Sequence, residues 1–320
     1  MSSRRRDRID AAVLETTLRL AVVLSAGVTP VRAWALVAER SDLSGEVAPV
    51  VRGAAAALHA GDDASAVLRR GGEEWHALAA VWQVAATVGA PLSETLRDTV
   101  GALRDAAEVR DDVQVALAEP RSTARLLGWL PVLGVPLGGA LGVDVWGVLT
   151  GGTVGVVCLV GGVGLVVASR VWARTLERRA RPGTEVPGLR AELFVVALAG
   201  GVSVDAARAL VERALPSPRD VRSSRRRREE PGGAGDAEQG RREVDEALAL
   251  SERAGAPARE LLRGTAWLQR QRARSAGRTA AAELATRLLV PLGVCTLPAF
   301  LLLAVVPMIL AVVRSEVLPF

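Results

Sequence analysis

The sequence predicts an all-α membrane protein with two cytoplasmic helical bundles, arranged as tandem modules, and three transmembrane helices. Three observations lead to this fold class. Long uncharged apolar runs begin at residues 126, 145 and 288, each of a length suited to crossing a membrane. The chain before them is rich in Ala, Leu and charged residues, which favour helix. Short phrases recur in the same order in the two halves, which indicates a duplicated unit.

The clearest repeat has the pattern G-A-P-x-x-E-x-L-R and occupies residues 89–97 and 255–263. A second pair lies upstream, with the turn phrases Gly-Val-Thr at 27–29 and Gly-Val-Ser at 201–203. In each phrase a Gly can end one helix, and Thr, Ser or Pro can begin the next. The candidate residues of this repeated turn motif, for packing or for contact with a partner, are Gly27, Gly201, Gly89, Pro91, Glu94, Gly255, Pro257 and Glu260.

The repeated carboxylates Glu94 and Glu260 fall in the first turn of the helix that follows each G-A-P turn. Acidic side chains stabilise a helix at that end, so stabilisation of the helix is the first interpretation. A catalytic or metal-binding role is the alternative. A further possibility is that the two turns shape a partner-facing surface, and the sequence leaves that choice open.

The repeats define two cytoplasmic modules, residues 1–125 and 170–287. Each is expected to end in a long helix that leads into the membrane, over 92–118 and 258–286. Residues 216–243 interrupt the second module with many charges, Gly and Pro but one large apolar residue, which predicts a disordered linker. Its run Arg225–Arg228 could bind acidic lipid or nucleic acid, but a solvated linker with incidental charge is the favoured interpretation.

The membrane segments are expected over residues 126–143, 145–169 and 288–313. Arginines are dense before the first span and after the second, and absent at the break beside Asp144. The positive-inside rule then places both modules and the N-terminus in the cytoplasm, and residues 314–320 outside as an external tail. Glycines at four-residue spacing predict close helix packing in the hairpin of the first two spans: Gly134, Gly138, Gly142, Gly147, Gly151 and Gly155.

The sequence offers no chemistry for catalysis. There is no Lys, which a phosphate-binding P-loop requires, and the two histidines, His59 and His76, have no metal-ligand spacing. No nucleophile elbow is present. Basic residues are not interleaved with aromatic ones, so nucleic-acid binding is not expected. The sequence therefore predicts a protein that is not an enzyme and needs no metal or cofactor.

The two G-A-P-x-x-E-x-L-R phrases, the Gly-Val-Ser/Thr turns and the stretch Pro-Leu-Gly-Val-Cys-Thr-Leu-Pro-Ala-Phe at 291–300 resemble the type II secretion system F domain family. Actinobacterial members of the Flp/Tad pilus platform group are the most similar in these motifs. The resemblance implies an inner-membrane platform that couples a cytoplasmic secretion ATPase to the assembly of pilin-like subunits. It also implies a second platform protein or self-association, and it brings no catalytic residues with it.

Two other classes of protein fit the predicted topology. A transporter would need more spans and a polar site within the membrane. A membrane-anchored helical scaffold or signalling protein with no secretion role fits the topology as well as a platform does, and only the family motifs separate the two.

Overall fold

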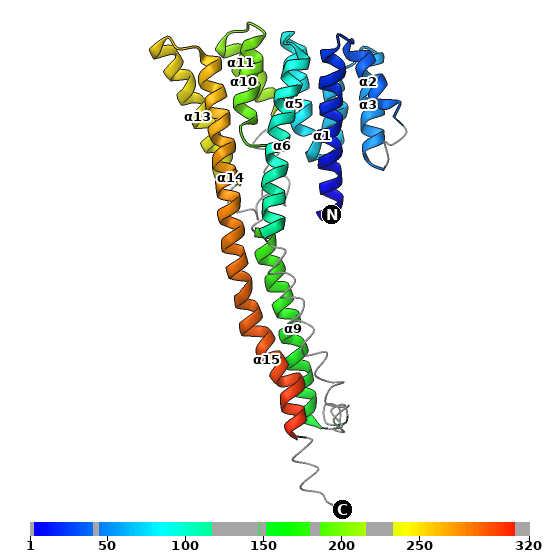
Figure 1. Cartoon of the computed structure of the whole chain (residues 1–320), viewed down its shortest axis with the longest axis vertical. Helices are drawn as coiled ribbons and strands as arrows, with labels where there is room; N and C mark the ends of the chain where they lie inside the picture. The colour runs from blue at the N-terminus through cyan, green and yellow to red at the C-terminus, as the bar shows by residue number, and fades with distance from the viewer. Residues whose placement is uncertain are drawn as a thin grey trace, which may run out of the picture. The chain divides into compact units, whose positions relative to one another are not determined.

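The computed structural model describes residues 3–40, 45–116, 147, 152–179, 186–215 and 233–310. Helices are the regular secondary structure throughout these ranges, and no strand occurs in them, which confirms the all-α class. The chain divides into two compact units (Figure 1). The first unit contains residues 1–110 and 182–276, and the second contains residues 111–181 and 277–320.

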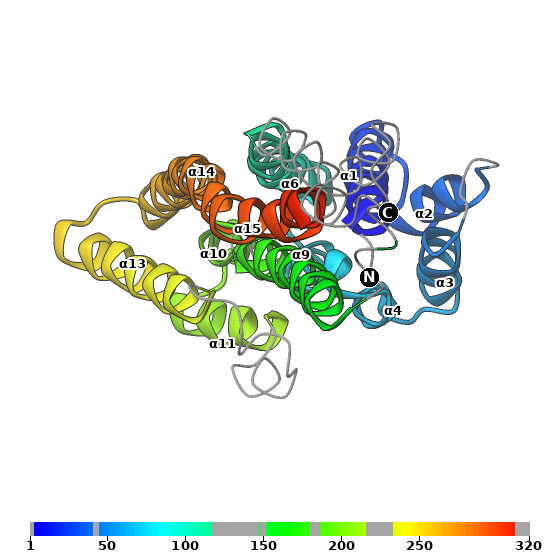
Figure 2. The ribbon, with the colours of Figure 1, turned by 90° about the horizontal axis from the view of Figure 1, so that it is seen from below.

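The first unit is built from helices of both predicted modules. From the first half come α1 (Ser3–Ser25), α2 (Pro30–Ala38), α3 (Val47–His59), α4 (Ala64–Arg70), the short η1 (Glu73–Trp75), α5 (His76–Val88) and most of α6 (Leu92–Ala116). From the second half come α10 (Leu189–Ala199), α11 (Val204–Ala214), α13 (Gly233–Ala254) and the start of α14 (Ala258–Pro291). Helices α1 to α4 gather on one side of this unit, and α10, α11 and α13 on the other (Figure 2).

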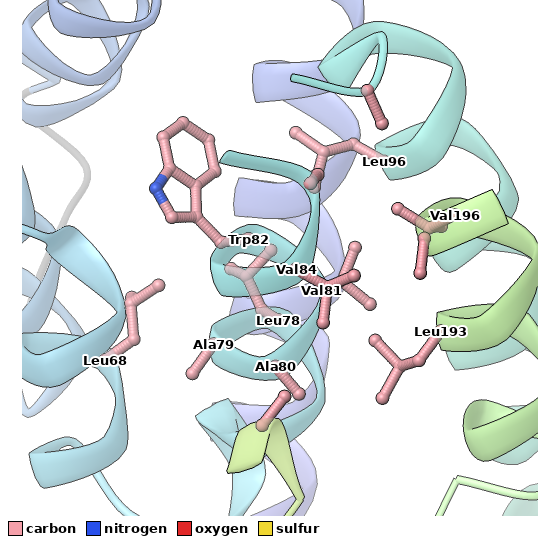
Figure 3. Close-up of a cluster of buried hydrophobic side chains, with 14 of the residues drawn as sticks. Leu68, Leu78, Ala79, Ala80, Val81, Trp82, Val84, Leu96, Leu193 and Val196 are labelled. Atoms are coloured by element: carbon pink, nitrogen blue, oxygen red, sulfur yellow. The ribbon is translucent and has the colours of Figure 1, made fainter. Parts of the chain in front are cut away.

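A single apolar core runs through both halves of the first unit. Helix α5 lies at its centre, because it is apolar on nearly every face and packs against α4 on one side and α10 and α11 on the other. Trp82 on α5 meets Trp34 on α2 edge to face, with ring centroids 5.5 Å apart. On the opposite side, Val81 and Val84 lie with Leu193 and Val196 of α10 (Figure 3). The two predicted modules therefore share one core.

The predicted linker differs from the structure over residues 233–243, which form the first half of α13. The expectation of disorder there was wrong because the charges are spaced for a helix. Arg242 lies 3.6 Å from Glu238 one turn earlier, and Gln239 donates to Glu243 at 3.0 Å. The helix is also anchored downstream by Val244 in the core. Residues 216–232 lie outside the described ranges.

The second unit consists of α9 (Thr153–Arg179), the last turns of α6 and α14, two short π-helices, η3 (Leu292–Thr296) and η4 (Leu301–Val305), and α15 (Leu297–Phe300) between them. The wide turns flank Pro298 and begin just after Pro291. Proline removes a backbone donor, and the helix adjusts its hydrogen-bond register around it. The helical segment therefore departs from α-helical geometry beside these prolines and forms π-helical turns.

Two of the described helical segments are long and apolar enough to cross a membrane, Thr153–Leu176 and Ala258–Leu310. They overlap the second and third predicted spans. The first predicted span, 126–143, lies outside the described residues, so a total of three spans stays a prediction. The two cysteines, Cys158 and Cys295, are buried within these segments and unpaired, as their apolar surroundings predict.

Candidate functional site

The four glycines of the repeated turn motif all have left-handed backbone conformations. Their φ angles are 82° at Gly27, 80° at Gly201, 70° at Gly89 and 65° at Gly255. Only glycine takes this conformation without steric cost, and no other residue type adopts a positive φ among the described residues. Each glycine follows the end of one helix, and the next helix begins three residues after it. The sequence repeat is thus also a repeat of backbone geometry.

The residues after each glycine begin the next helix in matching ways. At the upstream pair, the carbonyls of Thr29 and Ser203 each accept a backbone hydrogen bond at 2.8 Å from the residue four positions later. At the downstream pair, the carbonyls of Pro91 and Pro257 accept from the backbone N–H groups of Thr95 and Leu261, at 3.1 and 3.3 Å. Proline at these positions fixes the backbone for the first helical turn.

The structure brings the two downstream turns together at one arginine. Arg263, the last residue of the second repeat phrase, lies 3.6 Å from Glu94 of the first phrase and 3.8 Å from Glu260 of its own. All three side chains are more than 40% exposed. Exposed ion pairs contribute about 0–1 kcal/mol to stability, so these pairs hold the turns in register more than they stabilise the fold. The two upstream glycines lie elsewhere in the unit: Gly27 joins α1 to α2, and Gly201 joins α10 to α11.

A ladder of ion pairs continues from this point along α6 and α14. Arg270 contacts Asp105 at 3.3 Å, and Arg274 contacts Asp105 and also Glu108 at 3.3 Å. In the second unit, Arg278 donates to Asp112 at 2.8 Å. We refer to these pairs, together with Arg263–Glu94, as the α6–α14 ladder. The partners pair in the same order along both helices, so the two helices run parallel within the first unit.

The sequence analysis did not identify this ladder. The signal was present: acidic residues on α6 and arginines on α14 recur at three-, four- and seven-residue spacings, which place them on one face of each helix. The acids are Glu94, Asp98, Asp105, Glu108 and Asp112, and the arginines are Arg263, Arg270, Arg274 and Arg278. Two such faces can be matched only once the helices are known to be neighbours, and sequence spacing does not establish that.

One carboxylate at the ladder lies in the interior. Glu192 on α10 accepts a close hydrogen bond from Arg270, and its side chain is 14% exposed. Its second oxygen, Oε2, is buried without a hydrogen-bond partner among the described residues. Burial raises the pKa of Glu192 to about 7, and the neighbouring Arg270 opposes that rise. Burial also raises the pKa of Asp98, against the attraction of Arg263.

Most of the glycines that were predicted to pack in the membrane hairpin lie outside the described residues. They are Gly134, Gly138, Gly142 and Gly151, whereas Gly155 is buried on α9. Among the described glycines of the second unit, the closest contact is made by one that the sequence analysis did not name, Gly162. A Cβ at Gly162 would lie 2.4 Å from Leu303 Cγ, so α9 meets the last helical segment closely there. Nearby, the Ser169 hydroxyl donates to the Pro291 carbonyl at 3.2 Å.

None of these arrangements assembles a recognisable catalytic centre. The described residues contain no cluster of three or more His, Cys, Asp or Glu side chains that could hold a metal ion. The site consists of two long helices that begin at paired turns and are linked by ion pairs, an arrangement suited to transmitting force. Salt and pH can act on such a link.

Residues 16–135 match the family model described as Type II secretion system (T2SS), protein F. No curated protein matches the chain. The matched residues contain α1 to α6, including the turns at Gly27 and Gly89.

Proposed function

We propose that the chain is an inner-membrane platform protein of a Flp/Tad-type pilus or secretion machine, because its residues 16–135 match the model of the type II secretion system protein F family. In this role it couples a cytoplasmic secretion ATPase to the assembly of pilin-like subunits. Proteins of this family are inner-membrane proteins, and the two candidate spans fit that location. The protein itself performs no enzymatic reaction in this proposal and needs no cofactor.

The observation that carries the proposal is the meeting of both G-A-P turns at Arg263. Helices α6 and α14 begin at these turns and run parallel in the first unit. A force applied at the turns by a partner would act on both helices together, because the α6–α14 ladder links them at several levels. The acidic surface of Glu94 and Glu260 is 59% and 69% exposed, so a partner can reach it.

Charge reversal at the turns tests this proposal. Glu94→Arg and Glu260→Arg remove the exposed acids, and Asp205→Arg is the matched control because Asp205 is also an exposed acid in a first helical turn, that of α11. We expect all three variants to insert in the membrane. The Glu94 and Glu260 variants should lose co-purification of the secretion ATPase and surface pili, whereas the Asp205 variant should keep both. Normal pili in all three would leave the membrane-anchored scaffold as the better function.

The proposed topology has three spans, with both modules in the cytoplasm and the C-terminus outside. Thiol labelling of intact cells tests it, using chains in which Cys158 and Cys295 are replaced and one new cysteine is added. A cysteine beside Asp144 or near Phe320 should react with an impermeant reagent, and one at residue 230 should not. Labelling of a cysteine at residue 230 in intact cells would contradict the proposed orientation.

A further inference from the structure

An apolar groove between α1 and α2 is open to solvent. It has a volume of about 310 Å³ and is lined by Leu18, Arg19, Val22, Val23, Leu36, Val37 and Arg40. The exposed fractions of Leu18, Val22 and Leu36 are 46%, 57% and 36%. Scattered apolar residues on a surface are ordinary, but these three lie together in one hollow.

The internal repeat supplies a second copy of the same groove. Gly27 corresponds to Gly201, which aligns α1 and α2 with α10 and α11. Leu18, Val22 and Leu36 then correspond to Glu192, Val196 and Leu210. All seven equivalent positions in the second copy are buried or half-buried. Among the described residues, the groove is therefore open in the first copy and filled in the second.

Helix α5 fills the groove of the second copy. Val81 and Val84 of α5 lie beside Leu193 and Val196 (Figure 3). The packing is close enough that a Cβ at Gly200 would lie 2.5 Å from Val88 Cγ2. The end of α11 is held as well, because Arg69 on α4 donates to the Ala214 carbonyl at 3.5 Å.

The repeat also identifies a counterpart of α5. Gly89 corresponds to Gly255, which aligns α5 with α13. The face of α5 toward its own half contains Leu78 and Trp82, and the equivalent residues of α13, Val244 and Leu248, are buried in the same way. The other face differs: Val84 is 1% exposed, whereas its counterpart Leu250 is 45% exposed. On this face of α13, Leu250 is therefore uncovered, whereas Ala247, the counterpart of Val81, is buried.

Charge distinguishes the open groove from the filled one. Two arginines, Arg19 and Arg40, line the open groove, and both contact the carboxylate of Glu15, at 2.5 and 3.0 Å. On α13, the exposed Glu246 lies one turn before Leu250. The equivalent residue on α5 is Ala80, which is buried in an apolar contact. The open groove and the surface of α13 around Leu250 are therefore complementary in both apolar surface and charge.

We propose that this chain associates with a second copy of itself head to tail, with α13 of one copy filling the α1–α2 groove of the next. The contact repeats between copies the packing that α5 makes with α10 and α11 within one copy. It joins two different surfaces, so each added copy offers a new groove and a new α13, and assembly proceeds to a ring or an open row. The contact does not depend on the identity of the ATPase or the pilin.

Disulfide cross-linking tests the contact in the full-length protein with Cys158 and Cys295 replaced by Ala. Two singly substituted chains, Val22→Cys and Leu250→Cys, are mixed in detergent and oxidised. The control mixture pairs Val22→Cys with Leu268→Cys, because Leu268 is also 45% exposed but lies on α14. We expect several-fold more linked dimer from the first mixture. Equal yields, or no dimer from either mixture, would overturn the proposal.

A charge exchange tests the same contact without a covalent trap. Arg19→Glu and Glu246→Arg should each weaken self-association roughly tenfold, because each places like charges across the contact. The double variant restores opposite charges with reversed sign and should regain most of the association. Light scattering over a range of protein concentrations measures the mass. A parent protein that stays monomeric, or a double variant no better than the single ones, would contradict the proposal.

Discussion

The two halves of the first unit have the same turns but different packing. Gly89 and Gly255 have φ angles within 5° of each other, 70° and 65°, and each is followed by a proline that starts a helix. The helices before these glycines differ: Trp82 of α5 packs against Trp34, whereas its counterpart on α13 is Leu248. The family match covers the first half and ends before α10. The comparison shows that the conformation of a turn depends on the few residues within it. The packing of a helix depends instead on the neighbouring helices, which can differ between two copies of a repeat.

The largest expected effect comes from emptying the two equivalent core positions. Trp82→Ala removes a side chain that is 2% exposed and an edge-to-face contact, and should destabilise the first unit by about 3–5 kcal/mol. Leu248→Ala should cost less, about 2–3 kcal/mol, because a smaller side chain leaves a smaller cavity. Thermal unfolding in detergent compares the two. Equal losses would mean that the halves are packed alike after all.

Much of this fold could be predicted from the sequence because its signals are local. The glycines that end helices, the prolines that start them and the apolar runs of the membrane segments each act within a few residues. The prediction of disorder failed at residues 233–243, where composition suggested a loop but Glu238 and Arg242 are spaced for a helix. The sharing of one core by both halves could not be predicted, since it depends on which helix covers which groove.

A glycine in the second unit tests the opposite case, in which packing rather than a turn requires glycine. Gly162→Ala would place a methyl group 2.4 Å from Leu303 Cγ and should weaken the contact by about 1–3 kcal/mol. Gly164→Ala is the matched control, because nothing lies within 4 Å of its Cβ position. Unfolding in detergent should separate the two variants. A Gly164 variant as damaged as the Gly162 variant would point to a general effect on α9.

The turn glycines should respond equally in both halves. Gly89→Ala and Gly255→Ala introduce a side chain where φ is positive, and nothing lies within 4 Å of either Cβ position. The cost is therefore conformational, about 1–2 kcal/mol for each variant. Gly101→Ala, in the middle of α6, also meets open space and should stabilise by about 0.5–1 kcal/mol. Unequal losses at the two turns would break the proposed equivalence.

Glu192 is one position at which the halves differ in charge, since its counterpart is the apolar Leu18. The ordinary pKa of a glutamate, 4.5, is raised by burial to about 7 in the folded protein. Between these pH values the folded state holds more protons than the unfolded state, so the contribution of Glu192 to stability falls as pH rises from about 4.5 to about 7. Glu192→Gln should remove this slope in thermal unfolding across that range. The control, Glu212→Gln on α11, alters a more exposed carboxylate and should leave the slope in place.

The site was only partly predictable for the same reason as the fold. The sequence identified Glu94 and Glu260 as equivalent residues, because the repeat phrases contain both. It could not show that Glu94 lies beside Arg263, nor that Glu192 is buried beside Arg270, because each of these contacts joins helices far apart in the chain. The role of the repeated turns in binding a partner remains a prediction that the charge reversals test.

The smallest effect is expected at the contact that joins the two repeats. Glu94→Gln removes one charge facing Arg263 across 3.6 Å, but both side chains are more than 40% exposed, so the unfolding free energy should fall by less than about 1 kcal/mol. Glu260→Gln should cost as little, because its pair with Arg263 is longer, at 3.8 Å, and as exposed. Raising the salt concentration should erase both differences.

A small effect on stability combined with a large loss of ATPase binding would assign these carboxylates to contact with a partner. A residue with a purely structural role would instead affect binding only by lowering the stability of the fold. If Glu94→Gln instead destabilised the protein as much as Gly89→Ala, the carboxylate would be part of the turn itself, and the two repeats would be joined for structural reasons alone.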